Sequence, residues 1–146
     1  MKVIIAGSRR ITDPHLVAWA MDRAIEHGLV VTEVVSGQEP NGVDHLGELW
    51  ADAHGVPVRP FPARWEEFGP CGSPARRRAG PARNEEMACY AEALVALPDP
   101  ASRGTRDMIQ RARRHRLWVF QFEITGTRIR CWWKNPVIGP GAAPYF

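Results

Sequence analysis

The chain has 146 residues, 45% of them hydrophobic and 24% charged, which is the size and composition of a single globular domain. The net charge of +3 suits an anionic ligand but is too small to indicate a nucleic-acid-binding protein. No apolar run is long enough to cross a membrane, and three widely separated cysteines indicate reduced thiols of a cytoplasmic protein rather than disulfides or a zinc site.

The first 61 residues predict three strands and two helices in alternation. Residues 3–6 form a continuously apolar run, typical of a first strand rather than a signal peptide. Asp13 predicts the N-cap of a helix that Gly28 closes, and strand 32–36 follows. A loop with two glycines then leads into a helix predicted to begin at Asp44 and to end near Gly55, before a third strand at 56–61.

Residues 62–83 predict a long loop rich in proline, glycine and arginine, a kind of segment that is usually functional or partly disordered. Arginines 76–78, with Trp65 and Phe68 nearby, could follow a nucleic-acid backbone, but such a run is more often a solvated loop. A short helix over 84–91 and a strand over 93–97 come next. Thr105 then predicts the N-cap of a helix that precedes strand 118–123.

The last segment departs from this alternation. Residues 127–133 predict a further strand, paired antiparallel with strand 118–123 around a turn at residues 125–126. We therefore expect a main domain over residues 1–124 and a C-terminal extension over residues 125–146. Four aromatic residues make the extension a candidate surface for forming a homo-oligomer: Trp132, Trp133, Tyr145 and Phe146.

Alternating strands and helices predict an α/β fold with an open, mostly parallel sheet of about five strands and helices on both faces. Ligands of such sheets bind beyond the carboxyl ends of the strands. All the glycine-rich loops of this chain fall at that edge, which predicts a single site there. Glycines, hydroxyl groups and helix N-termini in such loops are typical of phosphate binding.

Each candidate residue also has a structural explanation. Gly7, Ser8 and Arg9 could bind phosphate or simply form a turn, and Asp44 could accept hydrogen bonds from a ribose or only cap a helix. Asn84 has the alternative of an N-cap, and Glu85 that of a first-turn carboxylate rather than a nucleophile or general base toward a sugar. The remaining candidates for ligand binding are Ser36, Gly37, Gly42, Arg83, Ser102, Gly104 and Thr105.

Four motifs in register resemble the YspA-like branch of the SLOG superfamily over roughly residues 1–120. They are VIIAGSR at 3–9, SG at 36–37 with GVD at 42–44, GPARNEEMA at 80–88 and SRGTRDM at 102–108. The resemblance implies a Rossmann-like fold that binds nucleotides or nucleotide-derived molecules. We expect no metal and no cofactor.

The same superfamily includes phosphoribohydrolases, and the related deoxyribosyltransferases use a glutamate toward the sugar. Where the hydrolytic members carry the catalytic glutamate of Gly-Thr-x-x-Glu, this chain has Met108, and its nearest acid is Asp107. Cleavage or transfer at an N-glycosidic bond, assisted by Glu85 or Asp107, is therefore one expectation. A non-catalytic sensor or sequestering protein for a nucleotide signal is the alternative, and nucleic-acid binding is the least favoured.

Overall fold

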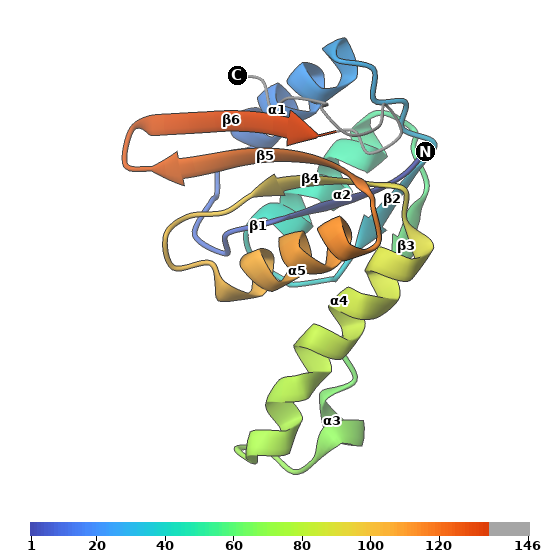
Figure 1. Ribbon diagram of the computed structural model, residues 1–146, viewed down its shortest axis with the longest axis vertical. Coiled ribbons are helices and arrows are strands. Elements are labelled where there is room, and N and C mark those ends of the chain that lie inside the picture. The colour runs from blue at the N-terminus through green and yellow to red at the C-terminus, as the bar shows by residue number, and fades with distance from the viewer. Residues whose placement is uncertain (135–146) are drawn as a thin grey trace.

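The structure, a computed structural model, describes residues 1–134 and shows an α/β fold built on one six-stranded sheet (Figure 1). The strand order is β3-β2-β1-β4-β5-β6. All neighbouring strands are parallel except β5 and β6, which are antiparallel. The predicted Rossmann-like open sheet with an additional C-terminal strand is confirmed.

The strands are β1 (Lys2–Gly7), β2 (Glu33–Ser36), β3 (Val58–Pro60), β4 (Ala93–Leu97), β5 (Trp118–Thr125) and β6 (Arg128–Lys134). The α-helices are α1 (Pro14–Glu26), α2 (Val43–Ala53), α3 (Trp65–Phe68), α4 (Ala79–Tyr90) and α5 (Arg103–Arg114), and a 3₁₀ helix, η1 (Pro74–Arg78), lies before α4. None of these helices is long and apolar enough to cross a membrane.

Apolar side chains cover both faces of the sheet. On one face, Val3 and Ile5 of β1 pack with α1, α2 and the aromatic side chains of β5 and β6. On the other face, Ile4 of β1 packs with the apolar sides of α4 and α5. Because β1 and β4 are buried on both faces, their sequences are continuously apolar rather than alternating.

The helix starts are partly as predicted. Asp13 does cap α1, because its side chain accepts a hydrogen bond from the N–H of His15 at 2.9 Å. Thr105 is not an N-cap: α5 begins two residues earlier, at Arg103, with Ser102 as the N-cap. The helix dipole still favours an anion at this end of α5.

Residues 62–83 are not the continuous loop that their composition predicts. They contain α3, η1 and the first residues of α4, which project away from the sheet (Figure 1). Pro81 is accommodated within α4 because it lies in the first turn, where its missing N–H would have no helical acceptor. Asn84 is consequently a buried residue inside α4, and its predicted place as an N-cap is wrong.

The β5–β6 hairpin is confirmed, with Thr125 opposite Arg128 at its closed end. Trp133 of β6 is only 4% exposed and its ring lies 6.0 Å from that of Phe120, so β6 contributes to the core of the same sheet. Residues 135–146 lie outside the described part of the chain, and with them two of the four aromatic residues of the predicted oligomer surface. Self-association therefore stays a prediction.

Candidate functional site

A cleft of about 790 Å³ lies at the carboxyl edge of the sheet. Its walls are the loops after β1 and β4, the first turn of α5 and the cleft-facing side of α4. Ten of the predicted site residues line it: Gly7, Ser8, Arg9, Asp44, Arg83, Asn84, Ser102, Gly104, Thr105 and Asp107. The topology argument thus brought most of the candidates together in one place.

The floor of the cleft is a hydrogen-bonded junction between the loops after β1 and β4. The hydroxyl of Ser8 donates to Asp99 at 2.5 Å, and the N–H of Arg10 donates to the Ser8 oxygen at 3.0 Å. Asp99 also accepts from the N–H of Ala101 at 2.8 Å, and the bond from Ser8 is the largest cause that lowers its pKa. Asp99 is not among the predicted site residues, yet its carboxylate joins the two central loops.

The N-terminus of α5 forms one wall. The first helical hydrogen bond runs from the N–H of Arg106 to the Ser102 carbonyl at 3.0 Å. The N–H groups of Gly104 and Thr105 precede it and have no acceptor among residues 1–134. Nothing lies within 4 Å of the position that a Cβ of Gly104 would occupy, so the backbone is open to a ligand on that side.

Three predicted residues at the end of β2 and in the loop that follows do not line the cleft: Ser36, Gly37 and Gly42. The hydroxyl of Ser36 donates to Glu48 at 2.6 Å. Gly42 has a φ of 79°, and its backbone lies directly against Ser8 and Arg9. The structure therefore gives Gly42 a packing role that holds the loops after β1 and β2 together.

Arg83 and Asp44 form the polar side of the cleft next to β2. Arg83 donates to the carbonyl of Gly37 and, at 3.5 Å, to that of Phe61. Burial raises the pKa of Asp44 from 3.8 to about 6, although the Arg83 guanidinium and the Glu39 N–H act to lower it. Asp44 is therefore the acid in the cleft that is poised to titrate near neutral pH.

Asn84 connects α4 with the start of α5. Its side-chain amide donates to the Gly104 carbonyl at 3.3 Å and to Asp107 at 3.0 Å. Asp107 also accepts from Arg111 at 2.9 Å. Since Asp107 is held by two donors, it is suited to fixing α5 against α4 more than to moving a proton.

Glu85 is not among the residues that line the cleft. Its carboxylate instead contacts Arg111 at 3.0 Å and His115 at 2.5 Å, on the side of α4 that faces the end of α5. Both bonds lower the pKa of Glu85. Conversely, Arg10 and Arg103 line the cleft without having been predicted, because an arginine near a turn carries no specific signal. Trp65 also lines it, although the sequence suggested this residue only for nucleic-acid binding.

Comparison with known proteins gives one match. A model of the YspA, cpYpsA-related SLOG family matches residues 1–68, the segment from β1 to α3. No curated protein and no solved structure matches the chain. Over residues 1–68 the chain is thus similar to the YspA, cpYpsA-related SLOG family, and this confirms for that segment the resemblance drawn from the motifs.

Proposed function

We propose that the cleft binds a nucleotide or a nucleotide-derived small molecule, with a phosphate at the N-terminus of α5. The similarity to the SLOG family suggests nucleotide-related binding. A volume of about 790 Å³ is within the range of roughly 300–1,000 Å³ that small-molecule sites occupy. The single observation that carries the proposal is the unpaired first turn of α5 inside this cleft.

The charges of the cleft support an anionic ligand. Two of its acids are already engaged, because Asp99 accepts from Ser8 and Asp107 accepts from Arg111. Arg77 and Arg103 also line the cleft, and within residues 1–134 neither side chain forms a hydrogen bond or ion pair. Unpaired guanidinium groups and open backbone N–H groups that line one cleft favour a phosphate.

Apolar residues on the same cleft would contact the base. Trp65 of α3 lines it and is 41% exposed, and Pro81, Met87 and Met108 also contribute to the lining. An exposed indole offers a flat face for stacking a base. Phosphate at α5 and base toward α3 would therefore place the sugar between them.

Cleavage at an N-glycosidic bond is the second candidate function, and Asp44 favours it. A general acid or base works best when its pKa is close to the working pH, and burial gives Asp44 a pKa of about 6. Of the two acids proposed first, Asp107 is bound by Arg111 and Glu85 lies outside the cleft lining. We therefore propose Asp44 as the acid to replace first in a test of hydrolysis.

The test is a thermal-shift screen with nucleoside monophosphates, NAD and cyclic nucleotides, followed by chromatography of the same samples. Arg103→Gln changes the cleft end of α5, and Arg114→Gln is a matched control on the same helix, exposed and outside the cleft lining. We expect a stabilising ligand whose effect is lost in Arg103→Gln and kept in Arg114→Gln.

The state of the recovered ligand separates the functions. An intact ligand supports a sensor or sequestering protein, whereas free base with sugar phosphate that disappears in Asp44→Asn supports a hydrolase. Absence of a shift with every compound would refute the proposed pocket. Binding that falls steeply with salt and depends on arginines 76–78 would instead indicate nucleic acid.

A further inference from the structure

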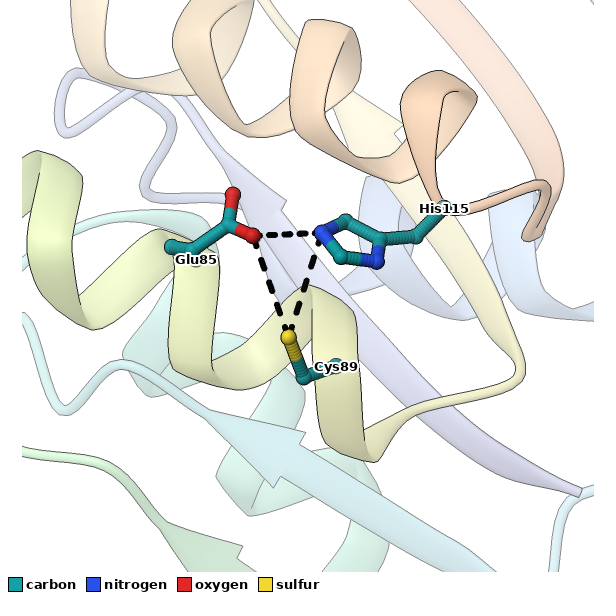
Figure 2. Close-up of side chains that lie close together, drawn as sticks. All are labelled: Glu85, Cys89 and His115. Atoms are coloured by element: carbon teal, nitrogen blue, oxygen red, sulfur yellow. Dashed lines mark hydrogen bonds and ion pairs between the residues drawn. The ribbon is translucent and has the colours of Figure 1, made fainter.

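Three side chains converge outside the cleft: Glu85 and Cys89 of α4 and His115 at the end of α5 (Figure 2). Glu85 Oε2 lies 2.5 Å from His115 Nε2. Cys89 Sγ lies 3.8 Å from the same carboxylate oxygen and 3.9 Å from the same ring nitrogen. The three potential ligand atoms thus form one compact triangle.

The fold holds this triangle in place. Glu85 and Cys89 are four residues apart on α4, so they lie on one side of the helix, one turn apart. His115 is the C-cap residue of α5, which packs against α4. Arg111 donates to the other Glu85 oxygen at 3.0 Å and so orients the carboxylate while leaving Oε2 directed at the cluster.

We propose that Glu85, Cys89 and His115 bind one divalent transition-metal ion, with Zn²⁺ the best match. Thiolate, imidazole and carboxylate are the donors that Zn²⁺ uses, and a thiolate with an imidazole disfavours Mg²⁺ and Ca²⁺. Binding releases the thiol proton to solvent. Cys89 and His115 are exposed, so water completes the fourth position.

The distances suit this assignment. Metal–ligand bonds of about 2.0–2.3 Å in a tetrahedral site place the ligand atoms roughly 3.3–3.8 Å apart. The sulfur is already 3.8 Å and 3.9 Å from its two partners. Only the Glu85–His115 pair, at 2.5 Å, must open, by about 1 Å, when an ion replaces the hydrogen bond between them.

The geometry argues against the main alternative, a catalytic cysteine. In such a site the histidine contacts the thiol through one ring nitrogen and an orienting group through the other. Here the carboxylate and the thiol both contact Nε2 of His115. Three groups that share one focal point are arranged for a common ion rather than for proton relay.

The experiment titrates the untagged full chain with Co²⁺ under reducing conditions and then displaces Co²⁺ with Zn²⁺. Co²⁺ reports a cysteine ligand through a thiolate charge-transfer absorption band. The free thiol of Cys71 and the exposed His45 are matched controls, since both lie outside the cluster. Cys89→Ser is compared with Cys71→Ser, and His115→Gln with His45→Gln.

We expect one ion per chain, a thiolate band in the wild type and both controls, and no such band in Cys89→Ser. Changes in outer groups around a metal typically cost about 10- to 100-fold in affinity, so His115→Gln should lower the Zn²⁺ affinity by more than that. A thiolate band that persists in Cys89→Ser, or absence of Zn²⁺ binding to a folded wild type, would overturn the proposal. Nucleotide binding in the cleft is measured separately, so either proposal can fail alone.

Discussion

Replacing Gly42 by alanine tests how closely the loops around the cleft are packed. Gly42 has φ 79° and ψ −149°, a combination that is essentially restricted to glycine. A Cβ at this position would also lie under 3.0 Å from the Ser8 carbonyl oxygen and from the Arg9 Cα. Both atoms belong to backbone, so they cannot move aside as a flexible side chain would.

The expected loss of stability adds these two effects. A strained backbone conformation costs about 1–3 kcal/mol, and forcing additional atoms into a packed contact costs about 1–3 kcal/mol more. The sum of about 2–6 kcal/mol is a large part of the roughly 5–15 kcal/mol that stabilises a typical domain. We therefore expect Gly42→Ala to lower the urea midpoint strongly and to weaken ligand binding at the displaced loop after β1.

Gly55→Ala is the matched control. Gly55 also has a positive φ, of 66°, but nothing lies within 4 Å of its Cβ position. Gly55→Ala should therefore cost only the backbone strain, about 1–2 kcal/mol, without a steric clash. Gly55 also lies outside the cleft lining. Equal losses of unfolding free energy in the two variants would refute the inference that Gly42 is required by the close approach of Ser8 and Arg9.

Four further predictions concern the titrating acids and two packed residues. Burial raises the pKa of Asp44 from 3.8 to about 6, so the free energy of unfolding should fall by up to about 3 kcal/mol as pH rises from 4 to 7. Asp44→Asn should remove this pH dependence in urea titrations. If the variant keeps the pH profile of the wild type, the burial of Asp44 is contradicted. The pKa of Asp99 is lowered, so the stability that its carboxylate contributes is present above pH 3.8 and is lost as the pH falls further. Asp99→Asn should therefore make the free energy of unfolding less dependent on pH in this acid range. Ser8→Ala leaves Asp99 without its 2.5 Å donor and should cost about 1–3 kcal/mol, whereas a neutral result would show that water replaces the hydroxyl. Trp133→Ala should cost about 3–5 kcal/mol and alter the near-ultraviolet circular dichroism of the core, and a loss below about 1 kcal/mol would show that β6 is dispensable.

Topology could be predicted from the sequence because the signals were local and mutually consistent. The strand at 93–97 is continuously apolar and is buried at every residue, and Asp13 with Pro14 marks the start of α1. Gly80 and Pro81 gave the opposite signal at the start of α4, since both residues are usually read as breaking a helix. The tertiary position of Pro81 in the first turn could not be recognised from composition alone.

The candidate site likewise has residues that the sequence could place and contacts that it could not. The rule for parallel sheets predicts that loops at the carboxyl edge lie together, and Ser8, Arg83 and Thr105 do line one cleft. The link from Asp99 to Ser8 spans 91 residues of sequence, and the contact of Cys89 with His115 spans 26. The first contact depends on the pairing of β1 with β4 and the second on the packing of α4 against α5, and no spacing along the chain encodes either.

The two edge strands of the described sheet, β3 and β6, both have features that oppose strand addition between molecules of this protein. β3 has three residues, and Pro60 at its end has no N–H to donate. β6 carries Arg128, Arg130 and Lys134. Short strands, prolines and cations discourage edge-to-edge strand addition. Growth of this sheet from molecule to molecule is thereby disfavoured at β3 by lack of a donor and at β6 by repulsion between like charges.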